Sequence, residues 1–165
     1  MKQVTMQDAF EVAIATEKAA QTLFQGLEAK FANHEDLAVL WQHFAEDESH
    51  HATWLSDLRS RLTAEQLAQQ VDTETIVLLQ AMSKISVEKA LTGVQDLDDA
   101  YNLVNELENG ETNAIFQFLL NNFEMDLKLR DFLRNQLNMH IARLETDLPS
   151  VYKSRMTRQA VQALS

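Results

Sequence analysis

Large apolar side chains recur at steps of three and four along the N-terminal third of the chain. This spacing keeps them on one face of an α-helix and predicts two long helices, over residues 7–31 and 36–62. Asp36 is the expected N-cap of the second helix, and the short connection over residues 33–35 predicts that the helices are antiparallel. The faces expected to be buried are Met6, Phe10, Ala13, Glu17, Ala20, Phe24, Leu27 and Phe31 in the first helix, and Leu37, Trp41, Phe44, Glu48, His51, Leu55, Leu58 and Leu62 in the second.

A mixed segment over residues 63–95 separates these helices from the second half of the chain. Thr63 and Asp72 are good N-cap residues, which predicts short helices within the segment. The expected elements are helices over 64–70 and 73–83 and a turn over 86–91. The segment is therefore interpreted as a long helical crossover, which lets the third long helix begin at the same end of the bundle as the second.

Two more long helices are expected, over residues 96–120 and 126–146, with Pro149 ending the last. Together with the first two they predict an all-α four-helix bundle over residues 1–148. Residues 149–165 predict an amphipathic tail helix that is basic on one side and either docks on the acidic body or contacts a second copy. Its basic residues are Lys153, Arg155 and Arg158.

The third long helix has two possible buried faces, and they differ in one acid. The first series includes both Glu108 and Glu111, whereas the second includes only Glu111. The first is Leu97, Tyr101, Val104, Glu108, Glu111, Ile115 and Phe118; the second is Leu97, Ala100, Val104, Leu107, Glu111, Ala114 and Phe118.

Composition supports long helices and excludes several function classes. The 165 residues contain only 3 Gly and 1 Pro, so few residues interrupt helices. Cysteine is absent, which excludes thiolate chemistry and Cys-ligated metals within these residues. The net charge of -11 disfavours nucleic acid and anionic membranes as partners. Without a signal peptide or a run of ~20 apolar residues, we expect a soluble cytoplasmic protein.

Glu48 and His51 interrupt the apolar face of the second helix, and Glu17 interrupts that of the first. A buried carboxylate costs several kcal/mol unless it is paired, protonated or bound to a metal. An approximate internal duplication carries Glu17 onto Glu108 when 91 is added to its number, and Glu48 and His51 correspond best to Leu137 and His140. Each half of the chain therefore offers a Glu on one helix and a His on the next.

Four-helix bundles that bind two metal ions use a Glu from each of two helices and a Glu-x-x-His pair from each of the other two. Leu137 stands where the second pair should begin, and Glu111 is a candidate substitute for the missing carboxylate. Carboxylates with a few imidazoles suit iron or manganese, and zinc is an alternative. The candidate ligands are Glu17, Glu48, His51, Glu108, Glu111 and His140. The alternatives are a buried hydrogen-bonded Glu48–His51 pair and a core His140 without metal.

A second group of polar residues shares another face of the second helix: His43, Glu46, Asp47 and His50. These residues form either a weaker cation site or an ordinary solvent-exposed face, and the second interpretation is favoured because exposed helix faces are usually polar.

The sequence resembles the rubrerythrin-like branch of the ferritin-like superfamily. The segment over residues 13–24, which contains Glu17, looks like the first helix of that family. The segment around Glu48 and His51 looks like the Ala-x-x-Glu-x-x-His-Ala motif of the second, and residues 98–108 are similar to the third. The resemblance implies a ferritin-like four-helix bundle with a non-haem di-iron site. It implies that Glu17 and Glu108 are terminal ligands, Glu48 a bridging ligand, and His51 and His140 nitrogen ligands.

The resemblance also implies redox chemistry with peroxide or oxygen, as a peroxidase or a ferroxidase. Because the chain has no cysteine, a rubredoxin domain is not expected and electrons are expected from a separate donor protein. A homodimer is the expected assembly. Leu137 favours two alternative functions: a non-catalytic bundle that binds iron or zinc at an incomplete site, and a metal-free helical interaction module.

Overall fold

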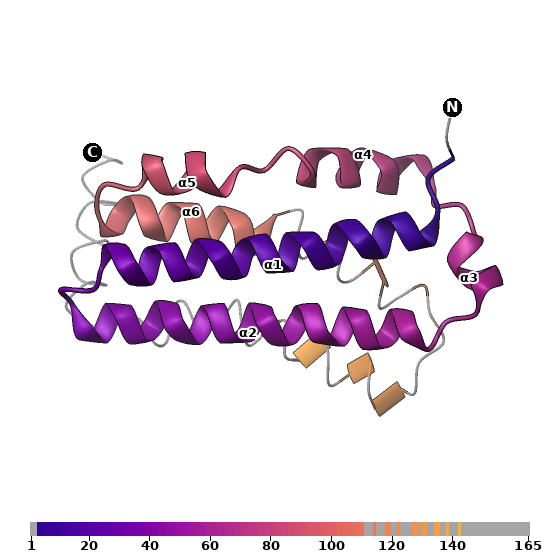
Figure 1. Ribbon diagram of the computed structural model, residues 1–165, viewed down its shortest axis with the longest axis horizontal. Helices are drawn as coiled ribbons and strands as arrows, with labels where there is room; N and C mark the ends of the chain where they lie inside the picture. The colour runs from indigo at the N-terminus through magenta and orange to yellow at the C-terminus, as the bar shows by residue number, and fades with distance from the viewer. Residues whose placement is uncertain are drawn as a thin grey trace.

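The computed structural model describes residues 3–110 and single positions further along the chain: 114, 118, 119, 122, 127, 128, 130, 131, 134, 135, 138 and 142. All of those single positions are helical. Up to residue 110 the helices are α1 (Met6–Lys30), α2 (Glu35–Ser60), α3 (Ala64–Ala68), α4 (Thr73–Met82), α5 (Val87–Gly93) and α6 (Leu97–Asn109). The predicted all-α bundle is confirmed (Figure 1).

The first two helices form the antiparallel pair that the apolar spacing predicts (Figure 1). Thr5 caps α1 through a reciprocal capping box with Asp8, which satisfies backbone donors at the helix start. The predicted N-cap of α2 is wrong by two residues. His34 is the N-cap, without a side-chain hydrogen bond, and the carboxylate of Asp36 instead accepts a hydrogen bond from the backbone N–H of Leu37.

The crossover between the second and third long helices is confirmed as helical. Thr63 caps α3 and Asp72 caps α4, as predicted. The turn expected over residues 86–91 is a helix, α5, which Ser86 caps. Figure 1 shows α4 and α5 along one side of α1, with α2 on the opposite side and α3 at one end.

Two apolar clusters fill the bundle, and a polar layer separates them along α1 and α2. One cluster uses residues 6–14 of α1 with Ala52 and Leu55 of α2. The other uses residues 20–27 of α1 with residues 37–45 of α2, and it includes the ring contacts of Trp41 and Phe44 with Phe24. The polar layer between the clusters consists of the buried side chains Thr16, Glu17, Glu48 and His51.

The buried face of α6 combines the two predicted alternatives. Ala100 is buried, as the second series requires, and Glu108 is buried, as the first requires. Ala114, which only the second series includes, is exposed. Glu108 is therefore an interior carboxylate, whereas the nearby Glu106 is exposed.

Several predicted features lie outside the described residues. They are Glu111, Leu137, His140 and the tail helix over 149–165. Within the described part of the chain, no helix is both long enough and apolar enough to cross a membrane.

Candidate metal centre

Glu17, Glu48 and His51 converge at the middle of the α1–α2 interface. One potential ligand atom from each lies within 4.8 Å of the other two. The Nδ1 atom of His51 is 3.3 Å from Oε2 of Glu48 and 3.4 Å from Oε2 of Glu17. Glu48 and His51 are neighbours because residues three apart lie on the same side of a helix. The antiparallel packing of α1 brings Glu17 to both of them.

All three side chains are shielded from solvent. The exposed fractions are 3% for Glu17, 2% for Glu48 and 4% for His51. The apolar clusters on either side of the polar layer account for this burial. A site that excludes water strengthens every electrostatic interaction within it, because the local dielectric is low.

Glu108 of α6 extends the cluster from a third helix. It is buried, and both its charge and its hydrogen bonding act on Glu48. Burial raises the pKa of Glu48 well above its ordinary value of 4.5, and the charges and hydrogen bonds of Glu17 and Glu108 raise the pKa further. Glu48 therefore lies within reach of carboxylates from two other helices, one on α1 and one on α6.

This donor set fits a metal ion. Three buried carboxylates beside one imidazole place more negative than positive charge in a water-poor interior, which is costly without a compensating cation or proton. The raised pKa of Glu48 is the effect expected when only protons are available to compensate. Carboxylate oxygens and imidazole nitrogen are ligands of iron and manganese, and zinc accepts them as well.

The described residues include four of the six candidate ligands. The structure brings together Glu17, Glu48, His51 and Glu108, whereas Glu111 and His140 lie outside the described residues. Whether any of them binds a metal stays a prediction.

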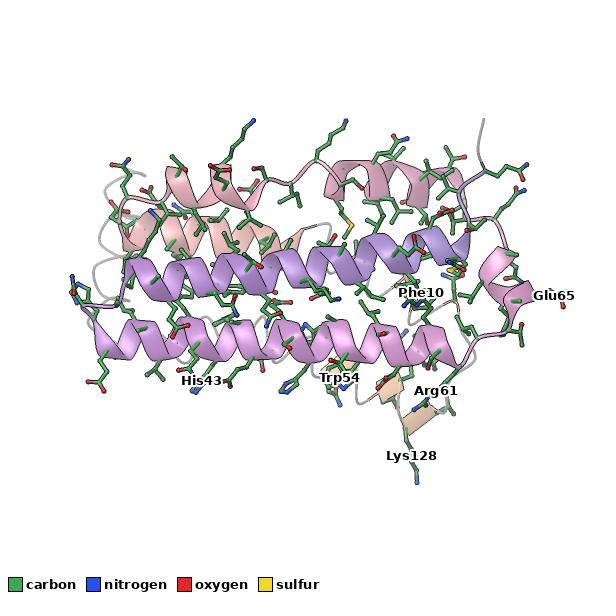
Figure 2. All side chains as sticks on the ribbon, in the orientation of Figure 1. Phe10, His43, Trp54, Arg61, Glu65 and Lys128 are labelled. Carbon is green, nitrogen blue, oxygen red and sulfur yellow. The ribbon has the colours of Figure 1, made fainter. Side chains whose placement is uncertain are left out.

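The second polar face of α2 lies mainly on the exposed side of that helix. His43, Glu46 and His50 are exposed, Asp47 is half-buried, and Figure 2 shows His43 pointing away from α1. Among the described residues, the three-residue group of Glu17, Glu48 and His51 is the one cluster whose atoms are close enough to share an ion. The interpretation as an ordinary exposed face is therefore favoured.

Trp54 is a neighbour of the centre that sequence reasoning missed. Its ring centroid is 5.5 Å from that of His51, with 39° between the ring planes. The sequence could have indicated this contact, because Trp54 follows His51 by three residues and residues at that spacing are neighbours on a helix. Trp54 is half-buried and packs against the first of the two apolar clusters.

Comparison with known proteins agrees with this geometry. The family model for rubrerythrin matches residues 8–125, a span that includes Glu17, Glu48, His51 and Glu108. Searches of curated proteins and of solved structures gave no match. The match confirms the predicted family and the all-α, ferritin-like class of the bundle. The chain therefore belongs to the rubrerythrin family.

Proposed function

We propose that this protein is a non-haem di-iron oxidoreductase that reduces peroxide, with oxygen as an alternative oxidant in a ferroxidase reaction. The observation that carries the proposal is the buried cluster of Glu17, Glu48 and His51, with Glu108 acting on Glu48 from α6. The family and this cluster fit a di-iron carboxylate protein. The catalytic activity, the identity of the metal as iron and the number of metal ions are proposals.

The side chains of the cluster have distinct roles in this proposal. Glu48 faces Glu17 on α1 and Glu108 on α6, so its carboxylate would contact both ions, and Glu17 and Glu108 would each hold one. His51 presents Nδ1 to the carboxylates, so Nδ1 is the nitrogen available to a metal. Two iron(II) ions, when bound by these residues, would supply the two electrons that reduce peroxide to water.

The protein controls water and protons at the centre. The apolar clusters on both sides exclude bulk solvent, which protects the reduced centre from side reactions. A proton resides on Glu48 more readily than on an ordinary glutamate because of its raised pKa. This proton has to leave before the carboxylate binds a cation, so Glu48 links metal binding to proton release.

We also propose a separate electron-donor protein and a homodimeric assembly. The donor is proposed because these 165 residues contain no cysteine with which to hold a rubredoxin-type iron. The homodimer rests on the frequency of two-fold symmetric oligomers.

A second candidate function is a binding site for one metal ion without turnover. Leu137 favours it, because leucine occupies the position where the internal duplication leads one to expect a second bridging Glu. In that case Glu17, Glu48 and His51 alone hold the ion.

Metal analysis of matched double variants tests the proposal. The test variant is Glu48→Ala/His51→Ala, and the control is Glu46→Ala/His50→Ala, which changes an exposed Glu and an exposed His of the same helix. The wild-type protein and the control are expected to bind two iron(II) ions per chain, and the test variant none. One ion per chain in the wild type supports the second candidate, and no iron in the wild type contradicts both.

Peroxide consumption then separates enzyme from binder. The iron-loaded, reduced wild-type protein and the control are expected to consume one peroxide for every two electrons, whereas the test variant consumes none. A wild-type protein that binds iron but consumes no peroxide is a binder and contradicts the proposed activity.

A further inference from the structure

An open hollow of about 480 Å³ lies between α1, the crossover and α6. The crossover loses its helical form between α4 and α5, where Figure 1 shows a link beside the middle of α1. On α1 the small side chains of Ala15 and Ala19 line the hollow, and Leu103 lines it from α6. Ile85 in the link also lines it and is 44% exposed, although it is large and apolar.

The polar groups of the lining are already engaged. The hydroxyl of Thr16 donates to the carbonyl of Val12 at 2.8 Å, and the hydroxyl of Ser83 donates to the carbonyl of Leu79 at 2.8 Å. The hydroxyl donors therefore offer little to a ligand, and the remaining surface is mostly that of Ala, Val, Leu, Ile and Met side chains. This lining favours a hydrocarbon body.

The charge around the hollow disfavours anionic ligands. Asp8 and Glu11 line it, and Asp8 is held in the capping box of α1. The chain as a whole carries a net charge of -11. Two carboxylates at the hollow repel a fatty-acid anion, so a neutral apolar ligand fits the hollow better than an anionic one.

The hollow borders the helices that carry the candidate metal centre. Ala20 lines it and follows Glu17 by three residues, so the two side chains are neighbours on α1. Leu107 lines it from α6 and directly precedes Glu108. The hollow and the centre are therefore built on the same stretches of α1 and α6.

The size of the hollow exceeds the needs of a small inorganic oxidant. A water molecule takes ~30 Å³ in the liquid, and hydrogen peroxide has only one more oxygen atom. Sites for small organic molecules typically measure ~300–1,000 Å³, a range that includes this hollow.

We propose that the hollow binds the hydrocarbon part of a neutral organic hydroperoxide, which makes alkyl and arylalkyl hydroperoxides substrates of the centre. The inference rests on the proposed function and names the substrate class of that same site. In the reaction the O–O bond of the hydroperoxide breaks on uptake of two electrons and two protons, giving one alcohol and one water. The electrons come from the separate donor protein of the proposed function, and the protons come from solvent.

Filling the hollow tests the inference. Ala19→Phe places a ring in the hollow, and Ala29→Phe makes the same change at an exposed position of the same helix outside it. Binding of cumyl alcohol, a redox-inert product analogue, is measured by calorimetry on the full-length chain. Binding to the wild type and to Ala29→Phe is expected to be equal, and binding to Ala19→Phe at least tenfold weaker. Equal binding to all three proteins, or no binding to the wild type, overturns the inference.

Kinetics of the iron-loaded protein provide the second readout. For Ala19→Phe we expect kcat/KM for cumene hydroperoxide to fall at least tenfold and kcat/KM for hydrogen peroxide to change less than twofold. A parallel fall for both oxidants, or no fall for either, overturns the inference. A wild type that reduces hydrogen peroxide but binds no cumyl alcohol contradicts the inference alone. A wild type that binds the alcohol but reduces neither oxidant contradicts the proposed function, and with it the assignment of a hydroperoxide.

Discussion

His51 of α2 and Glu17 of α1 meet across the helix interface, with Nδ1 of the imidazole 3.4 Å from Oε2 of the carboxylate. The same Nδ1 atom also faces Glu48, at 3.3 Å. One nitrogen thus faces carboxylates from two helices in a buried layer. Because such a layer needs compensation by a cation or a proton, its behaviour should depend on both pH and metal.

The first prediction concerns the stability of the metal-free protein. The pKa of Glu48 is higher in the folded state than in the unfolded state because of burial, Glu17 and Glu108. Between the two pKa values the folded state binds more protons, so the free energy of unfolding falls as pH rises through that window. For one proton the fall is at most about 1.4 kcal/mol per pH unit. Stabilisation is complete below the unfolded pKa and is lost as pH rises to the folded pKa.

Glu48→Gln should therefore be more stable than the wild type at neutral pH when both are metal-free, and its stability should vary less with pH above about 4.5. The measurement is urea unfolding at several pH values in the presence of a chelator. Glu46→Gln is the control, because Glu46 is an exposed acid on the same helix. An equal gain in both variants would show that net charge, rather than burial, is responsible.

The second prediction concerns metal binding and pH. Iron(II) should raise the melting temperature, because a ligand that binds only the folded state stabilises it by about 2.7 kcal/mol at 100 times Kd. For a chain of this size that corresponds to about 5–10 °C. The rise should be smaller at pH 5.5 than at pH 7.5, because the proton on Glu48 competes with the metal. Anaerobic calorimetry measures it, and equal rises at both pH values would contradict the role of Glu48.

The third prediction uses Trp54 as a reporter of the centre. Its ring centroid lies 5.5 Å from that of His51, so iron at His51 should quench the indole fluorescence. The chain has two tryptophans, and the other, Trp41, belongs to the aromatic cluster with Phe24 and Phe44. Titration of Trp54→Phe and Trp41→Phe with iron separates the two signals. Quenching that survives in Trp54→Phe and vanishes in Trp41→Phe would place the metal elsewhere.

Helical periodicity alone located the interior carboxylates of the first two helices. Glu17, Glu48 and His51 occupy positions that otherwise hold apolar residues, and an antiparallel pair of helices must bury such positions. The signal is strong because both helices are long and every other member of each series up to Leu27 and Leu55 is buried and apolar.

Features that depend on tertiary placement were harder to predict. Periodicity could not choose between two faces of α6, because a helix packed against several neighbours buries a wider face, which includes both Ala100 and Glu108. The choice of Asp36 as N-cap failed because α2 begins at Glu35, which places Asp36 inside the first turn of the helix. The hollow beside Ala19 arises where the crossover passes α1, and local sequence carries no sign of it.

The last prediction tests whether Glu108 belongs to the centre. Glu108 is 5% exposed and acts on Glu48, whereas Glu106, on the same helix, is exposed. If Glu108 holds a metal ion, Glu108→Gln should weaken iron(II) binding at least tenfold, because the amide lacks the charge that attracts the cation. Residues that only orient the metal ligands already contribute ~10–100-fold to metal affinity, so a residue that itself binds the metal should contribute no less.

Competition with a chelator measures the affinity, and Glu106→Gln should bind iron(II) as the wild type does. The same substitution should stabilise the metal-free protein, because one of the two charges that raise the pKa of Glu48 is removed. A metal ligand is expected to show weaker iron(II) binding together with a more stable metal-free fold. A residue that only supports packing is expected to differ, because loss of packing lowers both the iron(II) affinity and the stability of the metal-free protein. If Glu108→Gln lowers both quantities, Glu108 is a structural residue and the centre consists of Glu17, Glu48 and His51 on α1 and α2.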